Sequence, residues 1–188
     1  MDKETLFKES KAIQKGHFLL ASGKHSQFYF QAQNLLKYPD KAHLAGKLLS
    51  DLWSGKKIDV VVSLAIGGIV LGQEVARHLG ARHIFLERKG KHFSLERGFQ
   101  VHTNEKTLLV EDVITTGGSV KEAIKILENL DADIAGICSL VLRGSPDFKY
   151  PLKTLRKINW PVYKPKQCPL CKKKIPLYVP GTKQKKSR

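Results

Sequence analysis

The residues best suited to chemistry lie in one short segment, residues 108–119, with the sequence LLVEDVITTGGS. Two adjacent carboxylates, Glu111 and Asp112, end an apolar run, and a turn rich in Thr and Gly follows them. Such a turn at the start of a helix presents free backbone N–H groups and the positive end of the helix dipole, so it can hold a phosphate. Carboxylates repel a phosphate but suit the adjacent hydroxyls of a sugar or a magnesium ion. The segment predicts a site for a ribose 5-phosphate, and the alternative is that the acids only cap a helix or turn.

The order of these residues excludes two common nucleotide-binding motifs. A Walker loop ends in Gly-Lys followed by Ser or Thr, and a dinucleotide fingerprint places its glycines before the acid. Residues 108–119 match neither pattern. A phosphorylated sugar is therefore the better candidate ligand.

The elements that must position this segment alternate between short apolar runs and amphipathic stretches. Strands alternating with helices predict an α/β fold with a mainly parallel, doubly wound sheet. The polar segment 87–100 is too polar for the core and is either an exposed hairpin or a mobile lid. We expect a helix over 2–15 ending at Gly16, short strands or a hairpin over 17–21 and 27–31, a helix from Pro39 that stops at Gly55, helices over 68–79 and 119–130, and strands over 58–64, 82–86, 107–110 and 134–142.

Length and composition indicate one globular domain. The chain has 188 residues, of which 41% are hydrophobic and 27% charged. We find no apolar run near the ~20 residues that a membrane span needs, and the charged N-terminus does not resemble a secretory signal. Three cysteines are too few for a disulfide scaffold and fit a reducing compartment. We therefore expect a cytoplasmic protein with no membrane contact.

The positive charge is concentrated at the C-terminal end. The net charge is +16, yet residues 148–188 hold thirteen Lys or Arg and no acid, so residues 1–147 carry only +3. No RNA-binding signature accompanies this charge, so a solvated tail is favoured over a nucleic-acid arm. Nucleic acid is then an unlikely partner beyond nonspecific contact by the basic segment.

Cys168 and Cys171, in the sequence CPLC, form half of a zinc site. Zinc prefers four ligands, but Cys138 lies in a predicted buried strand and no histidine follows Cys171. A metal here needs a partner chain or a distant histidine. The default expectation is a pair of reduced thiols in a surface turn.

The segment LLVEDVITTGGS resembles the phosphoribosyl pyrophosphate (PRPP) motif of the type I phosphoribosyltransferases. In that family the two acids hold the ribose 2- and 3-hydroxyls, and the loop holds the 5-phosphate. The resemblance covers nearly the whole chain, and within the type I family the chain most resembles the orotate phosphoribosyltransferases. The further matching stretches are 16–26 as a substrate hood, 63–68 as a pyrophosphate loop, 88–91 as a mobile basic lid, Arg143 as an orotate-binding arginine, and the endings CPLC and VPGTK as features of a shorter subfamily.

The resemblance implies a set of site residues. Magnesium would be carried by PRPP, with no direct protein ligation, and the lid would act across a homodimer with shared active sites. The implied catalytic residues are Asp112, Arg88, Lys89 and Lys91; the PRPP-binding residues are Glu111, Asp112, Val113, Ile114, Thr115, Thr116, Gly117, Gly118, Ser119, Ala65, Ile66, Gly67 and Gly68; and the orotate-binding residues are Thr115, Arg143, Tyr29 and Phe30.

Each weaker match also has a plainer interpretation. Residues 63–68 could form an ordinary strand-to-helix turn, the lid could be a solvated charged loop, and Arg143 could cap the sheet. By sequence alone, the aromatic residues 28–30 are better candidates for the core than for stacking on a ligand. The chain also departs from the family pattern, with Ala21 where enteric-type enzymes have a lysine and with a shorter lid.

Together these features predict a single phosphoribosyltransferase domain over 1–188. The hood would comprise about 1–35 and 150–182, the core 36–149, and a basic tail 183–188. The expected reaction transfers ribose 5-phosphate from PRPP to orotate, giving orotidine 5-phosphate and pyrophosphate in de novo UMP synthesis. The alternatives are a phosphoribosyltransferase for a purine base and a PRPP-sensing regulator that binds nucleic acid.

Overall fold

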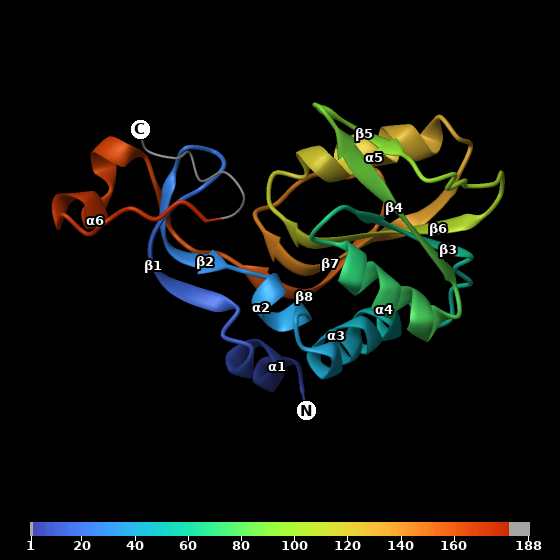
Figure 1. Ribbon diagram of the computed structural model, residues 1–188, viewed down its shortest axis with the longest axis horizontal. Coiled ribbons are helices and arrows are strands. Elements are labelled where there is room, and N and C mark those ends of the chain that lie inside the picture. Colours follow the sequence, from blue (N-terminus) through green and yellow to red (C-terminus); the bar gives the residue numbers. More distant parts are fainter. Residues whose placement is uncertain (1, 181–188) are drawn as a thin grey trace.

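A six-stranded sheet forms the centre of the larger part of the molecule (Figure 1). The computed structural model describes residues 2–180. The strand order is β5-β4-β3-β6-β7-β8, and every neighbouring pair is parallel except β4 and β5. This arrangement confirms the predicted α/β class with a mainly parallel sheet. The strands are β3 (Val60–Leu64), β4 (Arg82–Lys89), β5 (His92–Leu95), β6 (Lys106–Ile114), β7 (Asp133–Arg143) and β8 (Leu152–Ile158).

Helices cover both faces of this sheet. α3 (Pro39–Asp51) and α4 (Ile69–Leu79) lie on one face, and α5 (Gly118–Glu128) lies on the other (Figure 1). Successive residues of β3 point to opposite faces, so Val61 packs with one apolar cluster while Val60 and Val62 pack with the other. The nearly continuous apolar run of this strand is therefore explained by cover on both sides.

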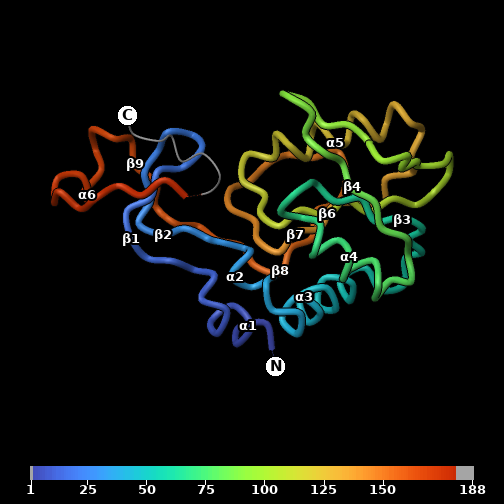
Figure 2. The backbone as a smooth tube through the Cα atoms, in the orientation of Figure 1, coloured from blue at the N-terminus to red at the C-terminus, as the bar shows by residue number. Residues whose placement is uncertain are grey.

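A second, three-stranded sheet lies beside the first and is built from both ends of the chain. Its order is β1-β2-β9, with β1 (Ile13–Leu19) antiparallel to β2 (His25–Phe30) and β2 antiparallel to β9 (Val162–Tyr163). Figure 2 shows the N-terminal and C-terminal traces running together there. We call β1, β2, β9 and residues 164–180 the hood. The remaining short helices are α1 (Lys3–Glu9), α2 (Gln33–Leu36), the 3-10 turn Pro165–Gln167 and α6 (Pro169–Lys172).

The first helix is shorter than the helical spacing predicts. α1 ends at Glu9, Lys11 has a φ of 50°, and Ile13 pairs with Phe30 in the hood sheet. The left-handed backbone at Lys11 stops the helix, and the pairing with β2 turns the next apolar residues into a strand. The prediction of a helix over 2–15 was wrong for its second half.

Two further segments take positions that the sequence left open or misplaced. β8 joins the large sheet by parallel pairing with β7, so the C-terminal part of the hood begins after Ile158, not near position 150. Within 87–100, β4 and β5 form a hairpin with Gly90 in its tight turn at φ 63°. The predicted tail 183–188 lies outside the described residues. No helix in the described part of the chain has the length and hydropathy of a membrane span.

Candidate active site

The loop between β6 and α5 has the geometry of an anion cradle. Gly117 forms the N-cap of α5 with a φ of 78°, a conformation that glycine adopts without strain. A Cβ atom at this position would lie 2.7 Å from Cζ of Phe148, so a larger residue would clash. The first N–H groups of α5 have no partner within the helix and face outward from its positive end. A phosphate would find several donors here.

The two acids are held at the C-terminal end of β6. The backbone N–H of Val113 donates to Oδ1 of Asp112 at 2.7 Å, and the N–H of Asp112 donates to Oε1 of Glu111 at 3.0 Å. These bonds fix both carboxylates at the edge where parallel α/β sheets place their ligands. The acid pair is therefore a rigid feature of the strand end.

The loop between β3 and α4 packs directly against this pair. A Cβ atom at Gly67 would lie 2.5 Å from Oδ2 of Asp112, so only glycine allows the two loops to meet. Nε2 of Gln33 reaches the carbonyl of Gly67 at 3.5 Å. The predicted pyrophosphate loop and the predicted ribose acids are thus neighbours in the structure.

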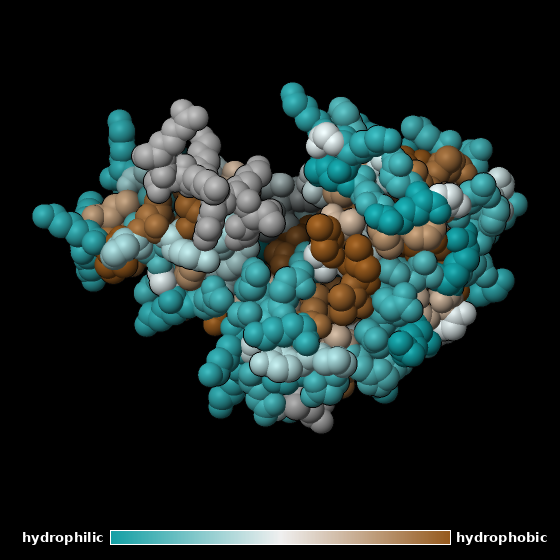
Figure 3. All heavy atoms as spheres, viewed as in Figure 1, coloured by the Kyte–Doolittle hydropathy of each residue, from teal (hydrophilic) through white to brown (hydrophobic). Residues whose placement is uncertain are grey.

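A cleft of 1320 Å³ lies between the hood and the end of the large sheet. Figure 3 shows this face hollowed between the two parts, with apolar side chains gathered at its centre. The core contributes Asp112 and part of the turn before α5, and the hood contributes aromatic and aliphatic walls. On the core side, the cleft is lined by Asp112, Val113, Thr115, Thr116 and Arg143. On the other side, it is lined by the hood residues Leu19, Tyr29, Phe30, Leu177, Tyr178, Val179 and Pro180, by Leu20 and Ala21 in the turn between β1 and β2, and by Trp160 just before β9.

Arg143 brings a positive charge to this cleft. It ends β7, is half-buried, and forms no ion pair within residues 2–180. Burial lowers the pKa of Arg143, while the neighbouring Tyr29 acts in the opposite direction. Burial and the charge of Asp112 raise the pKa of Tyr29, whereas Arg143 lowers it. A partly desolvated guanidinium without an acidic partner favours an anionic ligand.

The comparisons with known proteins agree with this geometry. Residues 31–163 match the family described as "Phosphoribosyl transferase domain". The chain is 44% identical to the orotate phosphoribosyltransferase of Caldicellulosiruptor saccharolyticus, over 99% of this chain and 100% of the relative. This chain belongs to the orotate phosphoribosyltransferase family.

Solved structures share the fold of this family member. The orotate phosphoribosyltransferase from Aeropyrum pernix matches with a TM-score of 0.72 and 22% identity, covering 84% of this chain and 94% of the other. An adenine phosphoribosyltransferase from Thermoanaerobacter pseudethanolicus matches with a TM-score of 0.62 and 19% identity, over 70% and 88%. The fold alone therefore does not select the base.

The structure brings part of the predicted site together in the cleft. Asp112, Val113, Thr115, Thr116, Arg143, Tyr29 and Phe30 line it. Ile114 is 2% exposed and packs in the core, so only its backbone is available to a ligand of this family. The remaining predicted PRPP-binding residues do not line the cleft; these are Glu111, Gly117, Gly118, Ser119, Ala65, Ile66, Gly67 and Gly68.

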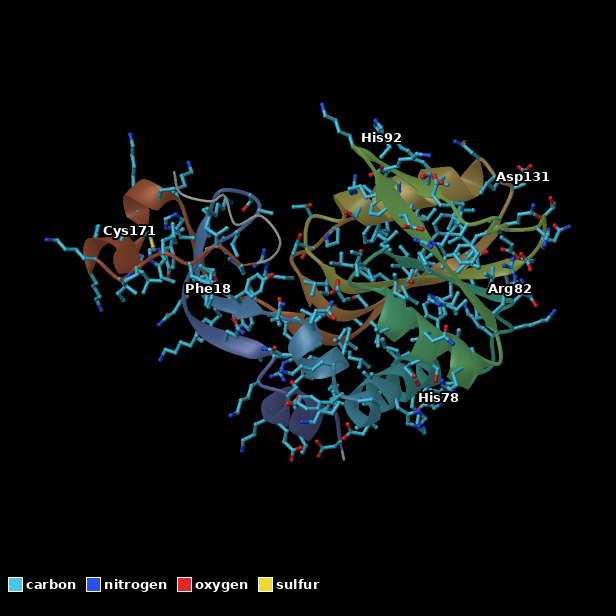
Figure 4. All side chains as sticks on the ribbon, viewed as in Figure 1. Phe18, His78, Arg82, His92, Asp131 and Cys171 are labelled. Carbon is cyan, nitrogen blue, oxygen red and sulfur yellow. The ribbon has the colours of Figure 1, made fainter. Side chains whose placement is uncertain are left out.

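The predicted lid residues lie outside the cleft. Arg88 contacts Glu122 of α5 at 3.3 Å and stacks on Phe93, and Lys89 lies 3.5 Å from Glu96. Figure 4 shows His92 at the outer end of this hairpin, on the core side of the molecule. Arg88, Lys89 and Lys91 are absent from the cleft lining. Within one chain, the hairpin therefore does not deliver its cations to the site.

Several cleft residues were not predicted as site residues. Trp160 lines the cleft and packs against Phe28 of β2 with ring centroids 5.4 Å apart. Tyr178 joins β1 because its N–H donates to the carbonyl of His17 at 2.8 Å. The ending VPGTK indicated only a shorter subfamily, not a wall of the cleft. Nothing in the local sequence shows that this segment folds back onto β1.

Glu111 provides a prediction for stability. Burial and the adjacent charge of Asp112 raise the pKa of Glu111 well above its usual value. A carboxyl whose pKa is raised by folding stabilises the protein at low pH, and this contribution is lost as the pH rises through the folded-state pKa. We expect Glu111→Gln to raise the melting temperature at pH 7–8, by about 2–4 °C for each kcal/mol gained, and to have little effect near pH 4.

Thermal unfolding at both pH values measures this difference. Glu128→Gln is the matched control, because Glu128 is only partly buried and its pKa is lowered chiefly by a hydrogen bond from Lys149. That variant should not be stabilised at neutral pH. Equal effects of Glu111→Gln at pH 4 and pH 8 would contradict a raised pKa.

Proposed function

We propose that this chain transfers ribose 5-phosphate from PRPP to orotate, giving orotidine 5-phosphate and pyrophosphate. The observation that carries the proposal is the position of Arg143, a half-buried cation with no ion pair among residues 2–180, in a cleft that Asp112, Thr115 and Thr116 also line. Orotate carries a carboxylate, so it supplies the anion that this guanidinium lacks. The name of the relatives, at 42–44% identity over nearly the whole chain, supports the same substrate.

In the proposed reaction the bond from the anomeric carbon to pyrophosphate breaks, and a bond to the base nitrogen forms. The sugar gains positive charge in the transition state, and negative charge grows on the leaving group. Glu111 and Asp112 would accept hydrogen bonds from the ribose hydroxyls, and the N–H groups of Gly118 and Ser119 would hold the 5-phosphate. The charge of orotate lies on its carboxylate, so the reacting ring nitrogen also loses its hydrogen, and this proton can pass to water or to the departing pyrophosphate. Catalysis then rests on positioning and electrostatics, and no protein nucleophile is required.

Magnesium fits this site as a companion of PRPP. The donors at the strand end are carboxylate oxygens, the ligand type that magnesium prefers, and no thiol or imidazole lines the cleft among residues 2–180. When bound, the ion supplies positive charge to the leaving pyrophosphate. We propose that PRPP carries it, with Glu111 and Asp112 holding the ribose hydroxyls close to it.

We also propose a homodimer in which each lid serves the partner's site. Two observations support this: the lid cations lie outside their own cleft, and Ile66 in the loop before α4 and Val70 in its first turn are 85% and 44% exposed. Apolar side chains so exposed beside a ligand site suit an interface between copies of this chain. A cytoplasmic location accords with three free cysteines among the described residues.

The substrate prediction is tested by a panel of bases with the wild type and Arg143→Ala. We expect loss of orotate absorbance in the presence of PRPP and magnesium, and no conversion of adenine. Losing a charge-assisted contact costs roughly 1.5–3 kcal/mol, so the KM for orotate should rise about ten- to a hundredfold in the variant. The KM for PRPP should change much less.

Arg156→Ala is the matched control, because Arg156 lies on β8 and pairs with Glu4 at 3.2 Å. It should keep both KM values near those of the wild type. Conversion of adenine in place of orotate would establish the purine-base alternative, and PRPP binding without turnover would favour a regulator. An equal rise of both constants in Arg143→Ala would make Arg143 structural.

A further inference from the structure

Four side chains of zinc-ligand type converge at the end of the hood farthest from the core. His17 comes from β1, His25 from β2, and Cys168 and Cys171 from the two sides of the first turn of α6. Their ligand atoms all lie within 4.8 Å of one another. Figure 4 shows Cys171 in this region, between α6 and the first two strands. The distant histidines that the CPLC motif needs are therefore present in the same chain.

The distances between these atoms fit a tetrahedral centre. Bonds of about 2.0–2.1 Å to nitrogen and 2.3 Å to sulfur place neighbouring ligand atoms roughly 3.3–3.8 Å apart. Nε2 of His17 lies 3.5 Å and 3.7 Å from Sγ of Cys168 and Cys171. Nδ1 of His25 lies 3.3 Å from Sγ of Cys171 and 2.9 Å from Nε2 of His17. One ion can reach all four atoms with little adjustment.

The tautomer of His17 suits metal binding. Its Nδ1 lies 2.8 Å from the carbonyl oxygen of Ile175, and because a carbonyl cannot donate, Nδ1 must carry the hydrogen. In the neutral ring, the lone pair of Nε2 then faces the cluster. A metal-binding histidine ordinarily has its second nitrogen held by such a partner. The orientation of this ring is thus fixed before a metal arrives.

The other features of the cluster favour zinc over alternatives. Both cysteines are free thiols, and His17, His25 and Cys168 are almost fully buried. Two thiolates and two neutral imidazoles balance the charge of a divalent ion, which removes the cost of burying it. A tetrahedral set of two sulfurs and two nitrogens selects zinc among the common divalent metals. With no position left for water, the site is structural.

We propose that His17, His25, Cys168 and Cys171 bind one structural zinc ion. The expectation of a surface turn was wrong for Cys168, which is fully buried. The C-terminal part of the hood has little regular structure of its own, because β9 contains two residues and α6 only four. The ion joins the C-terminal segment to the β1–β2 hairpin, in the role that metals play in small domains with insufficient cores.

The zinc ion also organises one wall of the cleft. Directly after Ile175, whose carbonyl holds His17, the chain reaches Leu177 and Tyr178, which line the cleft. The carbonyl of Tyr178 accepts from the N–H of Leu19 at 2.9 Å, and Leu19 lines the cleft as well. Loss of zinc should therefore loosen this wall. Any effect on the KM for orotate rests on the proposed function, whereas metal binding itself does not.

A second group of potential ligands provides an internal control. His43, Glu74 and His78 also lie within 4.8 Å of one another, on α3 and α4. This group has three members, contains no thiol, and its carboxylate also contacts Arg77 at 3.3 Å. It is a poorer zinc site on both ligand number and ligand type.

The test measures metal in the full chain, produced without a histidine tag in zinc-supplemented medium. Mass spectrometry of the metal content should find about one zinc per chain in the wild type. Cys168→Ser and Cys171→Ser should each reduce it to near zero. Cys138→Ala, which removes the buried thiol of β7, and His43→Gln, in the second group, should leave it unchanged.

Two further measurements apply if the serine variants fail to fold. Cobalt substitution of the wild type should give the intense visible absorption of a tetrahedral ion with thiolate ligands. His25→Cys should retain the metal, because cysteine is also a zinc ligand, whereas His25→Ala should lose it. Chelation should lower the melting temperature of the wild type by roughly 5–10 °C, as expected for a metal at about a hundred times its Kd.

Clear results would overturn the proposal. It fails if the wild type binds no stoichiometric zinc or cobalt, or if cobalt gives the weak spectrum of an octahedral ion. It also fails if His43→Gln loses the metal while Cys171→Ser keeps it. None of these readouts requires activity, so a failure of the proposed reaction would be recognised separately.

Discussion

Replacing Asp112 with Asn is expected to lower turnover about ten- to a hundredfold while leaving the fold intact. Asp112 lines the cleft at the strand end, where its carboxylate can accept hydrogen bonds from the ribose hydroxyls. An amide accepts less strongly, and the lost interaction costs roughly 1.5–3 kcal/mol if it strengthens in the transition state. Asn retains an oxygen for the bond from the N–H of Val113, so the local backbone should be preserved.

The measurement is kcat with saturating PRPP and orotate, together with thermal unfolding of the same samples. Asp133→Asn is the matched control. Asp133 begins β7, at the end of that strand opposite Arg143, and it forms an exposed ion pair with Lys106 at 3.0 Å. Exposed pairs of this kind contribute about 0–1 kcal/mol, so activity and stability should stay close to the wild type. Near-normal turnover of a folded Asp112→Asn enzyme would remove Asp112 from the catalytic residues.

Mixing two inactive variants is expected to restore activity. One variant is Asp112→Asn, and the other is the double replacement Lys89→Ala, Lys91→Ala. If the lid acts on the partner's site, a mixed dimer has one site with both an intact cradle and an intact lid, and a second site with both defects. Random exchange gives half mixed dimers, so about a quarter of the wild-type activity should return.

The position of the lid in one chain supports this proposed arrangement. The hairpin that carries Lys89 and Lys91 packs against α5 through Glu122, whose side chain accepts a hydrogen bond from the N–H of Phe93 at 2.7 Å. Neither lysine lines the cleft of its own chain. Lys89 lies 3.5 Å from Glu96, but both side chains are exposed, so its removal should cost little stability.

A paired control uses Lys47→Ala in place of the lid variant. Lys47 lies on α3 and pairs with Asp51 at the surface, so its variant should be active alone. Mixing it with Asp112→Asn should therefore give only additive activity. If mass analysis confirms mixed dimers of the two inactive variants but their activity stays absent, the lid works within its own chain.

Much of the core and of the site follows from local sequence. Local patterns predict the apolar run of β3, the amphipathic α5 and the segment LLVEDVITTGGS. The periodicity of apolar residues and the residue types of a turn are both set within a few positions of the chain. These signals identified the parallel sheet, and they placed Glu111 and Asp112 at the end of a strand and the glycine-rich turn at the start of a helix, where the structure has them. They also placed Arg143 at a strand end, which in a parallel sheet lies at the same edge as the acids.

Other features depended on contacts between distant segments, which periodicity does not report. The apolar spacing of Ala12 and Ile13 suggested a helix, but pairing with β2 made Ile13 part of a strand. β8 became a sheet strand because β7 was available as its neighbour. In both cases tertiary pairing overrode the local pattern.

The proposed zinc ligands show most clearly which features follow from the local sequence and which depend on the tertiary structure. The sequence by itself determined the family motif and identified Cys168 and Cys171 as half of a metal site. Only the tertiary structure brought His17 and His25 to them, across about 150 positions of the chain. Two cysteines close in sequence can be recognised as possible metal ligands from their spacing. A histidine on a distant strand becomes a ligand only when that strand packs beside the two cysteines. Local chemistry is therefore encoded in short segments, and the completion of a site is decided by packing.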